Sequence, residues 1–245
     1  MSDDTHKTSV EQPRQTSPVK RGVVRWLMRE IMGSLIAAAI LLGTAGRLDW
    51  VMAWVLVGVY LVWTGATALA VIPTHPEMLA ERTGPKKGSK GWDMAILGVV
   101  GLLETVKYVV AGLDMRWGWS PPFPPALQLV GVVVAVLAYD VILVWAMAVN
   151  AFFAQTVRIQ EERGHTVVTD GPYRYVRHPG YLGSILFQLA TPLILSSVWA
   201  FIPAGLITLL TILRTALEDK TLQAELGGYK EYAQRVRYRL VPGVW

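Results

Sequence analysis

The chain alternates long apolar runs with short polar connections, and the lengths of the runs predict membrane-spanning helices. A helix needs about 20 mostly apolar residues to cross roughly 30 Å of hydrocarbon. Four runs meet this requirement, at about 28–47, 51–72, 94–113 and 127–150. The pattern therefore predicts an all-α, polytopic transmembrane helix bundle.

A longer apolar block of about 36 residues runs from Tyr181 to Ala216. It is too long for one span and just long enough for a tight helical hairpin. Two serines and a proline interrupt it, so we divide it into helices at about 181–196 and 199–217. The total is about six spans.

The basic residues give the orientation of these spans. Lys and Arg concentrate on the cytoplasmic side of membrane proteins. In a six-span arrangement most of the 23 Lys and Arg fall on one side, in the N-terminal tail, the 73–92 loop, the 151–180 segment and the C-terminus. We therefore expect both termini to be cytoplasmic. We further expect a disordered cytoplasmic tail at 1–26, a four-helix membrane region at 27–154 and a ligand-binding region at 155–245.

Composition agrees with this reading. Hydrophobic residues make up 53% of the chain, and charged residues make up only 17%. The net charge of +5 does not indicate nucleic-acid binding, because the basic residues flank apolar runs as juxtamembrane charges do. The absence of cysteine excludes disulfides, thiolate nucleophiles and cysteine-based metal sites.

Three charged residues fall inside the third and fourth predicted spans, 94–113 and 127–150. Glu104 and Lys107 are three residues apart on one helix face, so we expect them to neutralise each other. Asp140 has no local partner, and an approach to Lys107 across helices is one possibility. We assign none of the three a catalytic role.

The stretch GPYRYVRHPGYLG, from Gly171 to Gly183, concentrates polar groups directly before an apolar run. The residue before a proline avoids the α region, so Pro179 is predicted to begin the next helix. A helix N-terminus beside Arg177 and His178 offers free N–H groups and positive charge. We interpret this stretch as a seat for an anionic group.

A second polar block begins at Ile212. Arg214 and Glu218 are four residues apart, so they share one face of the last predicted span. The hairpin that starts near Tyr181 returns to the same membrane edge, and this should bring Arg214 and Glu218 close to His178. Such a pocket would suit a zwitterionic ligand that carries a ribose.

The string HTVVTDGPYRYVRHPGYLG, from His165, closely resembles the signature of the isoprenylcysteine carboxyl methyltransferase family. This family belongs to a wider group that includes the phospholipid N-methyltransferases. The later string RTALED, followed by GGY, is also similar to theirs. The resemblance covers about 155–242, and no comparable motif occurs in the first four predicted helices.

The resemblance implies S-adenosylmethionine as cofactor, S-adenosylhomocysteine as product, and no metal. It implies cofactor contacts from His165, Thr166, Val167, Val168, Tyr173, Arg177, His178, Pro179, Gly180, Tyr181 and Glu218. Arg214 would face the methyl acceptor and, with Glu218, would form the catalytic pair. The family often has two consecutive glutamates where this chain has Glu218 and Asp219, so the role of Asp219 is open.

By the same resemblance, the enzyme would be a multi-pass membrane protein with its active site on the cytoplasmic side. The acceptor would be lipophilic, most simply the carboxylate of an isoprenyl-cysteine-like compound, and would enter from the bilayer among membrane lipids. Methyl transfer from a sulfonium releases a neutral thioether, so catalysis would rest on positioning and desolvation. The sequence indicates nothing about oligomeric state.

Three other readings are weighed against this one. A phospholipid or amine N-methyltransferase would use the same cofactor, with Glu218 or Asp219 as base. A membrane sterol reductase would bind NADPH at a similar Arg-His stretch, although Pro179 and Gly180 stand where that group has an asparagine before the tyrosine. A transporter or scaffold would rely on the ionisable residues within the spans.

Overall fold

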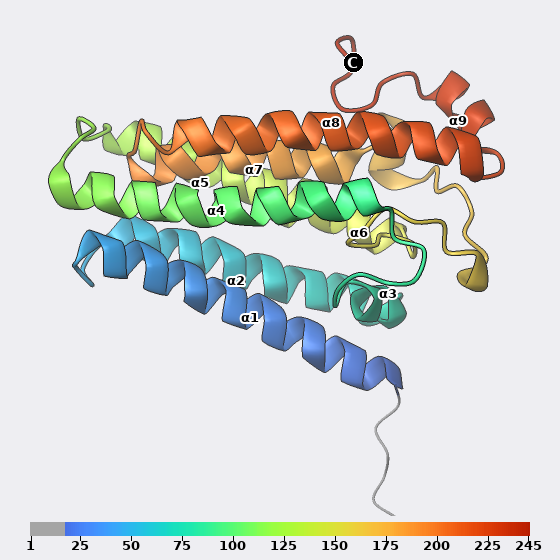
Figure 1. Cartoon of the computed structure of the whole chain (residues 1–245), viewed down its shortest axis with the longest axis horizontal. Helices are drawn as coiled ribbons and strands as arrows, with labels where there is room; N and C mark the ends of the chain where they lie inside the picture. The colour runs from blue at the N-terminus through green and yellow to red at the C-terminus, as the bar shows by residue number, and fades with distance from the viewer. Residues whose placement is uncertain (1–17) are drawn as a thin grey trace, which may run out of the picture.

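A computed structural model describes residues 18–245 of the chain, and these residues fold as an all-helical bundle (Figure 1). The long helices and helical segments are α1 (Pro18–Ala45), α2 (Val51–Val71), α4 (Gly91–Trp117), α5 (Pro125–Val136), a π-helical segment (Leu137–Leu143), α6 (Val144–Val149), α7 (Pro179–Leu195) and α8 (Phe201–Glu225). The short ones are α3 (Pro76–Glu81), α9 (Tyr229–Arg235) and two 3-10 turns, Glu161–Arg163 and Gly171–Arg174.

The long helices lie side by side and alternate in direction, as the spacing of the apolar runs predicts (Figure 1). Five helical stretches are long and apolar enough to cross a membrane: α1, α2, α4, the continuous stretch Pro125–Val149, and α8. The sixth predicted span is α7, a shorter apolar helix that runs back along the bundle beside α5 and α8. The all-α bundle is confirmed, with α7 shorter than the other passes.

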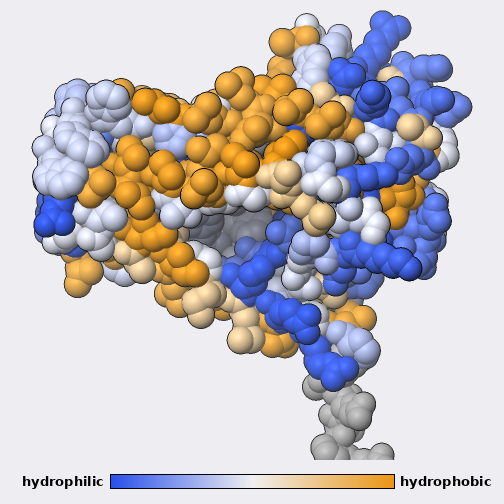
Figure 2. All heavy atoms as spheres, viewed as in Figure 1, coloured by the Kyte–Doolittle hydropathy of each residue, from blue (hydrophilic) through white to orange (hydrophobic). Residues whose placement is uncertain are grey.

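The outer surface of the bundle is suited to lipid. Large apolar side chains such as Leu69, Leu129 and Leu209 face outward and are at least 60% exposed. Figure 2 shows this apolar surface over the length of the bundle, while hydrophilic residues gather at the end where α7 begins and α8 ends. Apolar exposure on this scale is typical of helices that contact acyl chains, and the protein is an integral membrane protein.

Helix α1 begins earlier than the sequence pattern indicates. Residues 18–26 of the predicted tail are helical, while residues 1–17 of that tail lie outside the described part of the chain. The cause is Trp26, which is fully buried and packs edge-on against Trp63 of α2 at 6.4 Å. One buried indole anchors the polar first turns of the helix to the bundle.

Small residues line the contacts between helices. Buried alanines recur on facing helices, among them Ala38, Ala53, Ala111, Ala135 and Ala190. In lipid, helices associate through close backbone packing, which small side chains allow. The tightest neighbours are α5 with α7 and α1 with α4, so the final hairpin is packed into the bundle rather than attached to its side.

The predicted span at 127–150 is one continuous helical rod with a π-helical segment in its middle. Such segments change the direction of side chains and are frequent at functional sites. Asp140 lies in this segment, and its carboxylate has no hydrogen-bond partner within residues 18–245. The considered contact between Asp140 and Lys107 is therefore not found.

Glu104 and Lys107 neutralise each other, as expected. The Lys107 Nζ atom is fully buried and lies 2.7 Å from Glu104 Oε2. Gln188 of α7 joins the pair, because it accepts a hydrogen bond from Lys107 and donates one to Glu104. This neutral cluster ties α4 to α7 at membrane depth.

Candidate functional site

A cavity of about 380 Å³ lies at the hydrophilic end of the bundle. Its walls come from α1, α2, α4, the π-helical segment, α7 and α8, and from the chain between Asn150 and Val168. Figure 2 shows a hollow where the apolar surface meets the hydrophilic end of the molecule. The volume is that of a small-molecule site, and residues from both predicted regions of the chain, 27–154 and 155–245, line it.

Eleven of the twelve site residues expected from the sequence line this cavity: His165, Thr166, Val167, Val168, Tyr173, Arg177, His178, Gly180, Tyr181, Arg214 and Glu218. The twelfth, Pro179, is buried behind the wall as the first residue of α7. The expectation that the final hairpin brings His178, Arg214 and Glu218 to one cavity is thus met. The ligand roles of these residues stay predictions.

The sequence folds locally as its turn residues predict. His178 precedes α7 with φ −128° and ψ 61°, outside the α region, and Pro179 opens the helix. A Cβ atom on Gly183 would lie 2.6 Å from the Ala138 carbonyl oxygen, so this glycine lets α7 approach the π-helical segment. A Cβ atom on Gly180 would lie 2.6 Å from the Phe153 ring. Both glycines therefore serve close packing around the cavity wall.

The position of Arg177 beside the start of α7 suggests a contact with an anionic ligand, but its guanidinium contacts groups of the protein instead. Its guanidinium contacts both carboxylate oxygens of Asp219, at 2.7 and 3.0 Å. It also donates to the backbone carbonyls of Val236 and Arg237 at 2.7 Å. The charge of Arg177 is thus already balanced within the protein, and the residue shapes the cavity wall while it holds the segment after α9.

Asp219 is the centre of a buried polar network. Besides Arg177, its fully buried carboxylate accepts hydrogen bonds from Arg239 at 2.9 Å, Gln223 at 2.8 Å and the Tyr229 hydroxyl at 3.0 Å. His178 Nε2 lies 3.2 Å from the same carboxylate. Asp219 therefore has a definite structural role: it orients the imidazole that precedes α7.

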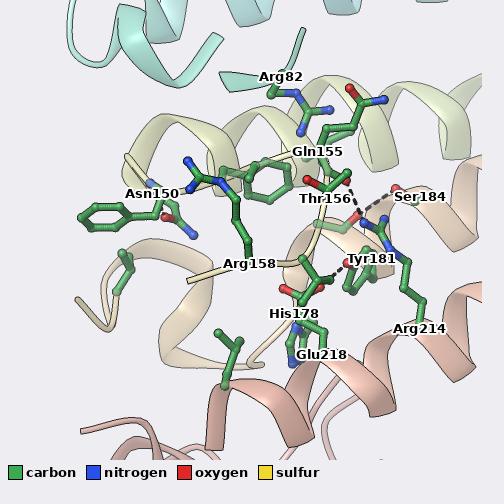
Figure 3. Close-up of a pocket in the computed structure, with 18 of the residues that line it drawn as sticks. Arg82, Asn150, Gln155, Thr156, Arg158, His178, Tyr181, Ser184, Arg214 and Glu218 are labelled. Carbon is green, nitrogen blue, oxygen red and sulfur yellow. Dashed lines mark hydrogen bonds between the residues drawn. The ribbon is translucent and has the colours of Figure 1, made fainter. Parts of the chain in front are cut away.

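Tyr181, Arg214 and Glu218 form one group on the cavity wall, with Tyr181 and Glu218 labelled in contact in Figure 3. The Tyr181 hydroxyl donates a hydrogen bond to Glu218. The Arg214 guanidinium stands 5.1 Å from the centre of the Tyr181 ring. His178 stacks beside the same ring at 5.8 Å. Glu218 has no cation within ion-pair distance among the described residues, so its charge is available to a ligand.

Arg214 is held by a partner that the sequence did not point to. Asp93, in the first turn of α4, is fully buried and accepts hydrogen bonds from Arg214 at 2.6 and 3.2 Å. Asp93 also accepts one from the Val157 backbone at 2.8 Å, and Arg214 donates to the Gln155 carbonyl at 2.7 Å. No local motif marks Asp93, because its partner lies 121 residues away.

His165 is set up as a neutral ring. Its Nδ1 accepts a hydrogen bond from the Gln160 backbone N–H at 3.3 Å, and its ring lies 4.6 Å from that of Phe152. Burial, together with the charges of Arg163 and Arg158, lowers the pKa of His165 to about 4. The ring is therefore uncharged at neutral pH, and Nε2 is left as a donor toward a ligand.

Five arginines line the cavity, against two carboxylates, those of Glu30 and Glu218. Burial also raises the pKa of the Tyr173 hydroxyl, which accepts a hydrogen bond from Asn150 at 2.9 Å and stays protonated. Within residues 18–245 no group of three or more His, Asp or Glu side chains could hold a metal ion. The lining of the site is thus rich in guanidinium and hydroxyl groups that can form hydrogen bonds with a ligand.

The chain is similar to known proteins over part of the length that builds this cavity. The model of the isoprenylcysteine carboxyl methyltransferase family matches residues 130–224. Protein-S-isoprenylcysteine O-methyltransferase B of Arabidopsis thaliana is 28% identical over 152 residues, which are 60% of this chain and 72% of that protein. The Dictyostelium discoideum protein-S-isoprenylcysteine O-methyltransferase is 24% identical over 173 residues, 69% of this chain and 68% of that protein. A probable enzyme of the same name from Oryza sativa subsp. indica is 28% identical over 117 residues, 45% of this chain and 59% of that protein.

Proposed function

We propose that this chain, which belongs to the isoprenylcysteine carboxyl methyltransferase family, is a membrane methyltransferase that esterifies the carboxylate of an isoprenyl-cysteine-like acceptor. The observation that carries the proposal is the position of the cavity. Tyr181, Arg214 and Glu218 line this cavity, and Figure 2 shows a hollow at the boundary between the apolar length of the bundle and its hydrophilic end. A water-soluble cofactor and a membrane-dissolved acceptor can reach such a place from different sides.

The residues fit S-adenosylmethionine. Glu218 is an unpaired carboxylate beside a tyrosine hydroxyl, and such a group suits a ribose hydroxyl or an ammonium group. His165, with its uncharged ring, and the adjacent Thr166, Val167 and Val168 offer a mixed polar and apolar wall for the base. When bound, the cofactor supplies a methyl group on a sulfonium, which leaves as a neutral thioether.

The chain contributes position and exclusion of water. The Arg214 Nη1 atom, which has no hydrogen-bond partner among the described residues, is assigned to the acceptor carboxylate, while Asp93 keeps the guanidinium fixed. A carboxylate is already a nucleophile at neutral pH, so no base is required. Tyr60, Trp63 and Tyr139 line the membrane-side wall and would exclude water from the reacting atoms.

The lining favours a carboxylate over an amine acceptor, because the guanidinium donors of its arginines can bind a carboxylate, whereas an ammonium group offers only donors. A phospholipid or amine N-methyltransferase therefore ranks second. The family match argues against the NADPH-dependent reductase. The neutral cluster of Glu104, Lys107 and Gln188 leaves little support for a transport path.

The proposal is tested by binding and turnover. We expect the purified protein to bind S-adenosylhomocysteine and not NADPH by isothermal titration. We also expect it to transfer labelled methyl to lipophilic carboxylates in preference to thiols and amines. Binding of NADPH alone, or of neither ligand, would overturn the assignment.

Variants distinguish the residues that bind the cofactor from the residue that binds the methyl acceptor. We expect His178→Ala and Glu218→Ala to weaken S-adenosylhomocysteine binding, because His178 and Glu218 line the assigned cofactor wall. We expect Arg214→Ala to keep binding and to abolish turnover. Unchanged S-adenosylhomocysteine affinity in both His178→Ala and Glu218→Ala would count against the assigned cofactor wall. Loss of that binding in Arg214→Ala would mean that Arg214 contacts the cofactor.

We further propose that the cavity faces the cytoplasm, because the basic loops lie at its end of the bundle. The chain has no cysteine, so single cysteines can report sidedness. An impermeant maleimide should label Lys87→Cys from the cytoplasmic side and Pro122→Cys from the other side. The reverse labelling pattern would show that the cavity faces away from the cytoplasm.

A further inference from the structure

Four of the five arginines that line the cavity are paired with carboxylates of the protein. Arg29 contacts Glu30 at 2.5 Å, Arg158 contacts Glu81 and Glu162, Arg177 contacts Asp219, and Arg214 contacts Asp93. Arg82 is the exception, because no ion pair of its guanidinium is found within residues 18–245. One cationic side chain in the lining thus has no ion-pair partner in the described part of the chain.

Arg82 is also poorly supplied with hydrogen bonds. It follows α3, and its Nε atom is buried without a partner in the described structure. Its guanidinium lies 5.2 Å from the centre of the Phe153 ring, a contact that stabilises the charge without using its N–H donors. Burial lowers the pKa of Arg82 to about 10, and the side chain stays charged at neutral pH. A partly buried, unpaired cation is costly unless a ligand compensates it.

The backbone at Arg82 is fixed. Arg29 of α1 donates a hydrogen bond to the Arg82 carbonyl and another to Gln155 at 2.6 Å. Glu30, the carboxylate that lines this wall, is in contact with Arg29. The charge of Glu30 favours the protonated form of Arg82, but no carboxylate of the described residues lies within ion-pair distance of this guanidinium.

The location of Arg82 indicates which ligand would use it. Figure 3 shows Arg82 on the side of the cavity opposite His178 and Glu218, the wall assigned to the cofactor. Tyr60, Trp63 and Tyr139, on the membrane side, belong to the same lining. Burial is the main cause of the lowered pKa of Arg82, the charge of Glu30 opposes it, and the charge of Arg214 is near enough to add to it. Two arginines thus flank the space between the two walls, and one of them is already balanced by Asp93.

We propose that Arg82 is the principal binding residue for the anionic group of the acceptor, and that it selects carboxylates over neutral analogues. This inference rests on the proposed function and adds a residue far from the sequence motifs. It assigns most of the binding charge to Arg82 and leaves Arg214 to orient the carboxylate. The methyl ester that forms carries no charge, so the same residue favours release of product.

The experiment measures binding apart from turnover. The probes are an S-farnesyl-cysteine derivative with a free carboxylate and its carboxamide, titrated into wild-type protein, Arg82→Gln and Arg82→Lys in the presence of S-adenosylhomocysteine. Lys87→Gln is the matched control, because it removes an exposed cation from the same loop. Wild type and the control should bind the acid at least about 10-fold more tightly than the amide.

In Arg82→Gln this preference should fall to below about 2-fold, while S-adenosylhomocysteine affinity stays within about 2-fold of wild type. Arg82→Lys keeps the charge but loses bidentate geometry, so it should be intermediate. If Arg82→Gln does not fold, the acid preference of Arg82→Lys tests the inference instead. An unchanged acid preference in the variants overturns the inference. A parallel loss of S-adenosylhomocysteine affinity in a folded variant also overturns it, because Arg82 would then hold the cofactor's carboxylate.

The two proposals fail in different ways. If wild type prefers the acid through Arg82 but transfers no methyl group to it, the proposed reaction is wrong and the anion subsite stands. If wild type methylates the acid while Arg82→Gln keeps its KM and its preference over the amide, the reaction stands and the subsite is wrong.

Discussion

The ion pair of Arg214 and Asp93 joins the middle of α8 to the start of α4, and its removal should be among the most damaging single changes near the cavity. The Asp93 side chain is fully buried, with 0% of its surface accessible, and the Arg214 side chain is 13% accessible. Asp93→Ala deletes two hydrogen bonds from Arg214 and one from the Val157 backbone. Breaking a buried pair in this way costs about 3–5 kcal/mol, because it leaves an uncompensated charge.

The assay is a double-mutant cycle of unfolding free energies, measured by SDS titration in mixed micelles. Asp93→Ala and Arg214→Met should each cost about 3–5 kcal/mol, and the double variant about 2–3 kcal/mol less than their sum. Lys90 and Glu225 form the matched control pair, because they join the same helices at 2.7 Å but are 30% and 43% accessible. Their coupling energy should be about 0–1 kcal/mol.

Equal coupling energies in the two cycles would refute the reasoning, since burial would then make no difference to the pair. Additivity in the Asp93 and Arg214 cycle would also refute it. A secondary readout is catalysis: because Asp93 fixes the guanidinium, Asp93→Ala should lower kcat more than it weakens S-adenosylhomocysteine binding. An unchanged kcat would mean that Arg214 does not need this anchor.

Two further predictions concern packing and protonation. Gly183→Ala would place a methyl group 2.6 Å from the Ala138 carbonyl oxygen, so a melting curve should show destabilisation by about 1–3 kcal/mol. Gly205→Ala, which meets no atom within 4 Å, should show none. Because the folded pKa of His165 is depressed from 6.5 to about 4, its contribution to stability is present above about pH 6.5 and is lost as pH falls toward 4. His165→Gln should therefore flatten the pH dependence of the melting temperature in that window, and an identical profile would contradict the neutral-ring assignment.

The fold was largely predictable because its determinants are local. A run of about 20 apolar residues fixes a span by length alone, and Pro179 fixes the start of α7 through its own ring. The short hairpin then brings His178 to Arg214 and Glu218 with little freedom. The early start of α1 was not predictable in the same way, because it depends on the packing of Trp26 against a tryptophan of another helix.

The site was less predictable, because its electrostatics depend on distant pairs. Nothing in the sequence near Arg177 indicates that its charge is balanced by Asp219 rather than left for a ligand. Asp93 and Arg82 lie in segments that read only as a helix start and a basic loop. Knowing which cation is left unpaired requires that all carboxylates be placed first, and only the tertiary structure does this.

The contacts of Asp219 have a consequence for how this end of the molecule moves. The Asp219 carboxylate contacts side chains from four segments of the chain. They are Arg177 and His178 before α7, Gln223 on α8, Tyr229 at the start of α9, and Arg239 after α9. The backbone of Arg177 and His178 is in turn bonded to the carbonyls of Tyr238 and Arg239. Opening any one of these segments breaks hydrogen bonds to Asp219 or to the chain after α9, so their amide protons should show similar protection from exchange with solvent.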